Sequence, residues 1–168
     1  MNGLEIERKY LIRMPDEAFV RALPGCQVWQ IEQTYLQSGV PGEARRVRRV
    51  CENSGVKYYY TQKRRIDAMS CEEREREISE SEFEALLLEA DAQLRTVKKR
   101  RLRVPWCGQL LEIDLYDFWL DRATLEIELE SETQPVCLPD WLCVVRELTG
   151  DRAYSNHSLA GHVPMEAL

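Results

Sequence analysis

Charged side chains recur at every second position in most of the segments that read as strands. The first of these segments, GLEIERKYLI at residues 3–12, places Glu5, Glu7 and Lys9 at alternate positions. Residues i and i+2 share one face of a strand but point in different directions on a helix. The spacing therefore predicts a chain built largely from strands that each carry a charged face.

Turn signals such as SGVPGE at 38–43 separate these segments. We expect one domain over residues 1–168, mainly β with α+β character, folded as an eight-stranded antiparallel β-barrel with a few peripheral helices. A barrel of this size can enclose one small ligand. The expected helices are 15–23 and 79–93, and the tail holds one short helical turn. The candidate strands are 4–12, 28–37, 44–51, 56–65, 71–79, 96–104, 109–118 and 123–131, with a further short strand at 143–148.

A strand with one solvated face would explain any single charged segment. Two properties of the whole set argue against that explanation. RRVRRV has only valines as apolar residues, and EEREREI carries Arg74 and Arg76 on its second face, so neither strand can cover an ordinary core. Acidic pairs also dominate the first, seventh and eighth strands, whereas basic pairs dominate the third, fourth and sixth. Inside a barrel, such groups require mutual pairing or a charged ligand.

The two kinds of strand together indicate one kind of chemistry. Clustered carboxylates bind hard divalent cations such as Mg²⁺ or Mn²⁺. Arginine and lysine bind phosphate oxygens. Hydrolysis of a phosphoanhydride at such a metal-phosphate site requires positioning, charge neutralisation and an activated water, and none of these requires a histidine.

The order and spacing of these pairs resemble the signature of the CYTH superfamily, the triphosphate tunnel metalloenzymes. EIERK is similar to the ExExK motif of that family. The later pairs in RRVRRV, TQKRR, EREREI, KKRR, EIDLYD and LEIELE resemble its RxR, TxK, ExE, KxR, ExD and second ExE strands. LTGDRAYSNHSLA resembles the C-terminal segment that closes the domain. The resemblance covers residues 3 to about 160.

The resemblance implies a tunnel that binds a small anionic triphosphate together with Mg²⁺ or Mn²⁺. The metal-site acids that it implies are Glu5, Glu7, Glu112, Asp114, Glu126 and Glu128. The implied substrate-binding residues are Lys9, Arg46, Arg48, Lys63, Glu75, Glu77, Lys99 and Arg101. The implied catalytic group is Glu5, Glu7, Lys9 and Tyr35, and a packed strand tyrosine is the alternative for Tyr35.

The C-terminal segment departs from the family pattern. Ala153 stands where the family often has arginine, with Arg152 one position earlier, and His157 stands where a basic residue often follows the asparagine. These changes leave the role of this segment open. The simplest interpretation of His157 and His162 is that they are exposed tail histidines.

Three functions fit this pattern. The first is a divalent-metal-dependent triphosphatase that cleaves the terminal phosphoanhydride of inorganic tripolyphosphate, or of a nucleoside or thiamine triphosphate. The second is an adenylate cyclase on the same tunnel, which would form cyclic AMP and pyrophosphate from ATP. The third is a non-catalytic module that binds polyphosphate or nucleotides. The retained carboxylates argue against the third, because a pure anion binder gains nothing from them without metal.

Composition limits the partners and the compartment. A net charge of −6 argues against nucleic acid as a partner, and no apolar run is long enough to cross a membrane. The six cysteines form no CxxC pair, which argues against a zinc knuckle. Because no secretory signal is visible, we expect a cytoplasmic protein with reduced thiols. The sequence leaves open whether the protein is a monomer or a homodimer.

Overall fold

The computed structural model describes residues 2–168, which form nine strands, three short α-helices and one 3₁₀ turn. The strands are β1 (Asn2–Arg13), β2 (Gln27–Leu36), β3 (Glu43–Glu52), β4 (Gly55–Arg65), β5 (Ser70–Ile78), β6 (Val97–Trp106), β7 (Gln109–Tyr116), β8 (Arg122–Leu129) and β9 (Val144–Glu147). The helical elements are α1 (Glu17–Arg21), α2 (Glu80–Leu87), the 3₁₀ turn η1 (Arg152–Tyr154) and α3 (Asn156–Gly161). None of the helices within residues 2–168 has the length and apolar composition that a membrane-spanning helix requires.

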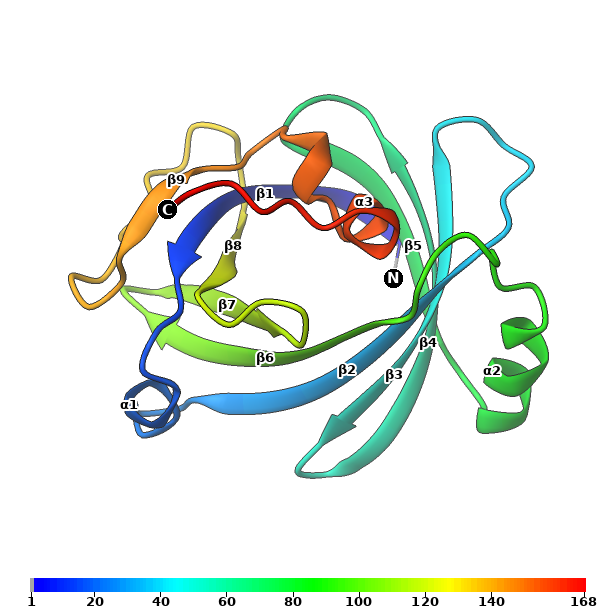
Figure 1. Ribbon diagram of the computed structural model, residues 1–168, viewed down its shortest axis with the longest axis horizontal. Coiled ribbons are helices and arrows are strands. Elements are labelled where there is room, and N and C mark those ends of the chain that lie inside the picture. Colours follow the sequence, from blue (N-terminus) through cyan, green and yellow to red (C-terminus); the bar gives the residue numbers. More distant parts are fainter. Residues whose placement is uncertain (1) are drawn as a thin grey trace.

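Within residues 2–168 the strands close into an antiparallel barrel of eight strands, with β9 added at one side. Their order is β5-β4-β3-β2-β6-β7-β8-β1, and a further pairing of β1 with β5 closes the ring. The register of this closure places Glu5 opposite Cys71. Figure 1 looks into the barrel, with α1 and α2 on its outer wall and α3 over its opening. The predicted fold class is therefore confirmed.

The predicted elements are all present, and their bounds differ by a few residues. The largest error is in the second helix, which was expected to extend to 93 but ends at Leu87. Its start is correct, because the Ser79 side chain accepts a hydrogen bond from the backbone N–H of Glu82. The helix stops early because the chain after it pairs with β2: the backbone N–H of Gln37 donates to the carbonyl of Glu89.

The largest apolar cluster lies outside the barrel. Leu102 and Val104 of β6 are fully buried there, although they alternate with the charged residues that face the lumen. Strands β1, β7 and β8 contribute most of the remaining residues of this outer core, and Val20 and Leu142 complete it. It is covered by α1 and by residues 130–143, which we call the sealing segment and which packs Trp141 against the cluster.

Two smaller apolar clusters complete the packing among the described residues. One lies under α2, where Phe83 packs against the outer faces of β3 and β4. The other gathers around Trp119 and Tyr154, where η1 and α3 meet the ends of β1, β2 and β6. The second cluster closes one end of the barrel. The apolar residues thus surround the lumen and leave its interior to charged groups.

Leu125→Ala is expected to lower the free energy of unfolding by ~2–5 kcal/mol, because Leu125 is fully buried in the outer core and truncation leaves a cavity. Urea denaturation followed by circular dichroism measures this change. Leu120→Ala is the matched control, because Leu120 is 92% exposed; it should change the free energy by no more than about 0.5 kcal/mol. Equally small effects of both substitutions would contradict a core outside the barrel.

Candidate functional site

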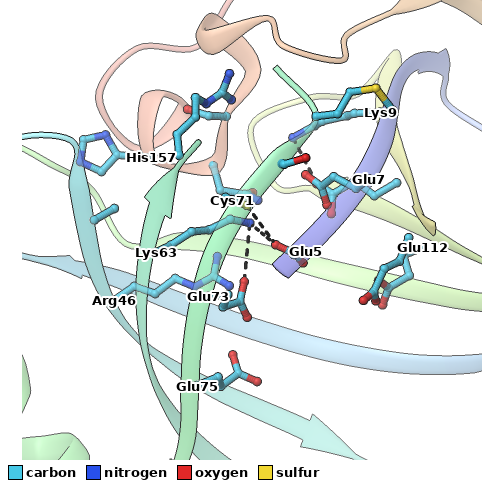
Figure 2. Close-up of a pocket in the computed structure, with 18 of the residues that line it drawn as sticks. Glu5, Glu7, Lys9, Arg46, Lys63, Cys71, Glu73, Glu75, Glu112 and His157 are labelled. Atoms are coloured by element: carbon cyan, nitrogen blue, oxygen red, sulfur yellow. Dashed lines mark hydrogen bonds and ion pairs between the residues drawn. The ribbon is translucent and has the colours of Figure 1, made fainter. Parts of the chain in front are cut away.

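The barrel encloses a cavity of about 910 Å³ that is lined by side chains from all eight barrel strands. Every barrel strand except β2 contributes charged residues, and β2 contributes Trp29 and Tyr35. Figure 2 shows part of this lining, with Glu5, Lys63 and Glu73 facing one another and Glu112 across the cavity. The sequence-predicted residues that line it are Glu5, Glu7, Lys9, Tyr35, Arg46, Arg48, Lys63, Glu75, Glu77, Lys99, Arg101, Glu112, Glu126 and Glu128. Asp114 is not among the lining residues.

The acidic wall is formed where β1 and β8 pair. Their register places Glu7 opposite Glu128 and Lys9 opposite Glu126. Lys9 neutralises Glu126 at 3.2 Å. Within residues 2–168, neither Glu7 nor Glu128 has a hydrogen bond or an ion pair to its side chain. Burial and the nearby Glu126 raise the pKa of Glu7 to about 7, and burial and Glu5 raise the pKa of Glu128.

A second group of charges surrounds Lys63 on β4 (Figure 2). Its Nζ lies 2.6 Å from Oε2 of Glu5 and 3.6 Å from Oε2 of Glu73. Burial alone would raise the pKa of Glu5, but the charge of Lys63 and the hydrogen bonds from Lys63 and Glu73 together outweigh burial and lower it. The Cys71 thiol donates to the same Glu5 oxygen at 3.4 Å. Lys63 therefore links β1, β4 and β5 at the seam of the barrel, the place where β1 and β5 pair to close the ring.

Arg46 and Arg48 of β3 also line the cavity. Glu75 of β5 fixes the second of them, because its Oε2 accepts from Nη2 of Arg48 at 2.7 Å and from the Thr61 hydroxyl at 2.8 Å. The Nε atoms of both arginines are buried without a hydrogen-bond partner among the described residues. Both guanidinium groups therefore belong to cavity-lining residues and each keeps an unused Nε–H donor.

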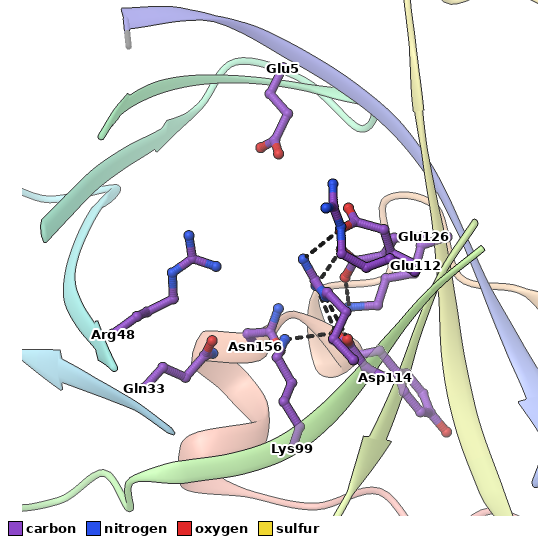
Figure 3. Close-up of polar contacts among 12 residues, drawn as sticks. Glu5, Gln33, Arg48, Lys99, Glu112, Asp114, Glu126 and Asn156 are labelled. Carbon is purple, nitrogen blue, oxygen red and sulfur yellow. Dashed lines mark hydrogen bonds and ion pairs between the residues drawn. The ribbon is translucent and has the colours of Figure 1, made fainter. Parts of the chain in front are cut away.

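Asp114 lies beneath the lumen surface and organises the cations of β6 (Figure 3). Its side chain is fully buried and accepts from Lys99 Nζ at 2.7 Å and from Arg101 Nε at 2.7 Å. Burial would raise the pKa of Asp114, but Arg101 and Lys99 outweigh it and lower the pKa. Arg101 also reaches Glu112 at 3.3 Å and Glu126 at 3.4 Å. Both oxygens of Asp114 are thus used to hold cations in place.

The segment after β9 closes one end of the lumen. Lys9 Nζ donates to the backbone carbonyl of Tyr154 at 2.8 Å. Asn156 Oδ1 accepts from Lys99 at 3.2 Å and from the Tyr116 hydroxyl at 2.7 Å. His157 is exposed, as expected, but it also lines the cavity, and its ring meets the edge of Tyr35 with centroids 4.9 Å apart.

Sequence reasoning missed several lining residues. Glu73 shares the charged face of EEREREI with Glu75 and Glu77 but was not predicted as a site residue, and Arg103 continues the alternation of Lys99 and Arg101. The spacing rule alone is therefore enough to place both in the lumen. Arg103 stacks on Trp29, with its guanidinium carbon 3.9 Å from the ring centroid, and bonds Glu112 at 3.1 Å. Asn156 carries no periodic signal, because it reaches the lumen from a helix that is distant in sequence.

The carboxylates of the lumen fit a hard divalent cation by their chemistry. Glu7 is half-buried and Glu128 is exposed to the cavity. Neither has a neutralising partner among the described residues, and oxygen donors of this kind are the ligands of Mg²⁺ and Mn²⁺. No three metal-binding side chains within residues 2–168 converge into a ready-made ion site. The ion pairs explain this, because Lys63 already pairs with Glu5 and Lys9 already pairs with Glu126. A cation would therefore have to exchange with these ammonium groups.

Solved structures share this architecture. The inorganic triphosphatase NE1496 is 28% identical, with a TM-score of 0.60 over 96% of this chain and 97% of that chain. A conserved hypothetical protein from Pyrococcus furiosus is 26% identical, with a TM-score of 0.57 over 77% of this chain and 80% of that chain. The chain has the tunnel fold of the CYTH superfamily. No family model and no curated protein matches the sequence.

A putative adenylate cyclase from Bacillus halodurans has the same fold, with a TM-score of 0.57 over 78% of this chain and 83% of that chain. Its identity of 16% shows the fold alone. The CYTH barrel is therefore shared by proteins described as a triphosphatase and as a putative cyclase. These neighbours support an enzyme of this superfamily, and the choice of reaction depends on the lumen itself.

Asp114→Asn is expected to lower the free energy of unfolding by ~3–5 kcal/mol, because it leaves Lys99 and Arg101 buried without their shared counter-charge. Urea denaturation at pH 7 measures the loss. Asp117→Asn is the control, because Asp117 directly follows the same strand and is exposed; it should be close to neutral. A neutral Asp114→Asn would show that this carboxylate does not organise the lumen cations.

Glu7→Gln is expected to stabilise the metal-free protein at pH 8 by roughly 1–3 kcal/mol and by much less at pH 5. The folded-state pKa of Glu7 is raised to about 7, so folding opposes its ionisation. Wild type therefore loses stability as pH rises from about 4.5 through 7, and the amide removes this loss. Urea denaturation with a chelator at both pH values tests the difference, with the exposed Glu130→Gln as control. An equal effect at both pH values would contradict it.

Proposed function

We propose that this protein is a divalent-metal-dependent triphosphatase that hydrolyses the terminal phosphoanhydride of inorganic tripolyphosphate or a related triphosphate. The observation that carries the proposal is the division of the lumen into an acidic wall on β1 and β8 and basic strands on β3, β4 and β6. A triphosphate needs cations for its oxygens. The metal bound to that triphosphate needs carboxylates next to these cations, and this lumen has cationic side chains and carboxylates within one cavity.

The basic strands supply the phosphate contacts in this proposal. Arg46 and Arg48 carry guanidinium groups suited to bidentate phosphate binding, and Lys63 is a compact charge near the seam. Two of these groups are already held in position, because Glu75 pairs with Arg48 and Glu5 pairs with Lys63. Phosphate oxygens replace these carboxylates as partners, so little side-chain ordering has to accompany binding.

The acidic wall supplies the metal site in this proposal. Glu5, Glu7, Glu126 and Glu128 would hold Mg²⁺ or Mn²⁺. When bound, the ion supplies Lewis-acid neutralisation of phosphate oxygens. We propose that Glu112 supports this wall.

Asp114 and the closed end of the barrel have positioning roles. Asp114 holds Lys99 and Arg101 toward the phosphate chain. Lys9 lies between the acidic wall and the carbonyl of Tyr154. In this position its ammonium group would neutralise a phosphate oxygen and stabilise the negative charge that develops as the phosphoanhydride bond breaks. The segment around η1 and α3 excludes water from this end of the lumen.

A substrate panel tests the proposal. The wild-type protein is incubated with tripolyphosphate, ATP and thiamine triphosphate, each with Mg²⁺ or Mn²⁺, and phosphate, pyrophosphate and cyclic AMP are measured. Phosphate release from at least one substrate is expected. Glu128→Gln should lower that rate by at least ~100-fold with the fold intact by circular dichroism. Glu130→Gln, two residues further along the chain and exposed, should retain the wild-type rate.

The products separate the alternatives. Formation of cyclic AMP and pyrophosphate from ATP would show that the protein is a cyclase with the same tunnel fold, and not a hydrolase. Binding of a triphosphate without any product from any substrate would replace the hydrolase by a non-catalytic module. A wild-type rate in Glu128→Gln would remove this residue from the metal site and leave the hydrolase to be explained by the other acids.

A further inference from the structure

Two cysteine thiols face each other on the outer surface of the protein, away from the lumen. Cys107 lies in the turn between β6 and β7, and Cys137 lies in the sealing segment. Both residues are exposed, and their Sγ atoms are 2.7 Å apart. A disulfide bond is about 2.05 Å long, so the two sulfur atoms need to approach by only ~0.7 Å to bond.

The backbones that carry the two thiols are already fixed relative to each other. Cys107 and Gly108 have φ values of 50° and 71°, the left-handed pair that a two-residue hairpin turn requires. The side chain of Gln109 then joins the hairpin to the sealing segment. Its amide nitrogen donates to the Pro135 carbonyl at 2.8 Å, and its oxygen accepts from the backbone N–H of Cys137 at 3.2 Å. The thiols therefore meet without any rearrangement of the fold.

Packing beneath the thiols reinforces this arrangement. Trp106, the residue before Cys107, meets the edge of Trp141 with ring centroids 5.8 Å apart. Trp141 also meets Phe19 of α1 at 5.7 Å. The two cysteines are 30 positions apart in sequence, and both lie on elements that are docked on the outer core. Their proximity is thus a property of the folded state.

We propose that Cys107 and Cys137 form a reversible redox site that a peroxide oxidises to a disulfide and a thiol reductant reopens. One thiolate attacks the O–O bond of hydrogen peroxide, which gives a sulfenic acid and releases the first water after protonation. The second thiolate attacks that sulfur, the S–S bond forms, and the S–O bond breaks with release of the second water. The two thiols lose two electrons and two protons in total, and one peroxide becomes two waters.

The disulfide would tie the sealing segment to the β6–β7 hairpin over the outer core. It closes a loop of the intervening chain and so restricts the unfolded state more than the folded state. The oxidised protein is therefore expected to melt about 5 °C or more above the reduced protein. The dithiol is distinct from the proposed catalytic groups, since neither cysteine lines the lumen.

The test uses the reduced full-length protein and hydrogen peroxide as the probe. After exposure, free thiols are blocked with N-ethylmaleimide, and the non-reduced digest is mapped by mass spectrometry. A crosslinked Cys107–Cys137 peptide, ~2 Da lighter than the two free-thiol peptides, is expected. Dithiothreitol should remove both the crosslink and the rise in melting temperature.

Matched cysteine variants make the outcome specific. Cys143→Ser removes another exposed thiol and should retain the crosslink and the melting shift. Cys137→Ser should abolish both. The proposal is overturned if wild-type Cys107 and Cys137 react with maleimide after peroxide as fully as Cys143 does. It is equally overturned if each is oxidised separately to a sulfinic acid with no crosslink.

Discussion

Opposite charges that face one another across the lumen are the interaction on which the rest of this structure depends. Lys63 lies 2.6 Å from Glu5, and Lys99 and Arg101 share the fully buried Asp114. Buried ion pairs contribute little net stability because desolvation offsets their attraction, yet removing one partner is strongly destabilising. The lumen is therefore constrained to balance its charges locally and contributes little to the free energy of folding.

Folding must then be driven from the other side of the sheet. The outer core on β1, β6, β7 and β8 and the cluster under α2 take the place that a barrel interior usually has. Two short helices and the sealing segment, which have no charged groups in the lumen, are needed because they cover these outer faces. The apolar area that these peripheral elements bury thus offsets the free-energy cost of desolvating the charged side chains in the lumen.

The alternation of charge allowed the sequence to predict most of the lining, because a strand residue's face depends only on its parity. Glu5, Arg48 and Lys63 were identified in this way and do face one cavity. The same rule could not reveal that Asp114 lies beneath the surface, since its burial depends on two cations of a neighbouring strand. Nor could it place Asn156, which contacts Lys99 from a helix 57 positions away.

β1 has three strand partners: β5 along its first half, and β8 and β9 along its second half. All three follow it in the chain, so this strand cannot complete its hydrogen bonds until residues as far as Glu147 have been synthesised. Contacts between such distant segments are slow to form. Assembly of the acidic wall is consequently a late step in folding, because Glu7 and Glu128 come together only when the first strand pairs with the eighth.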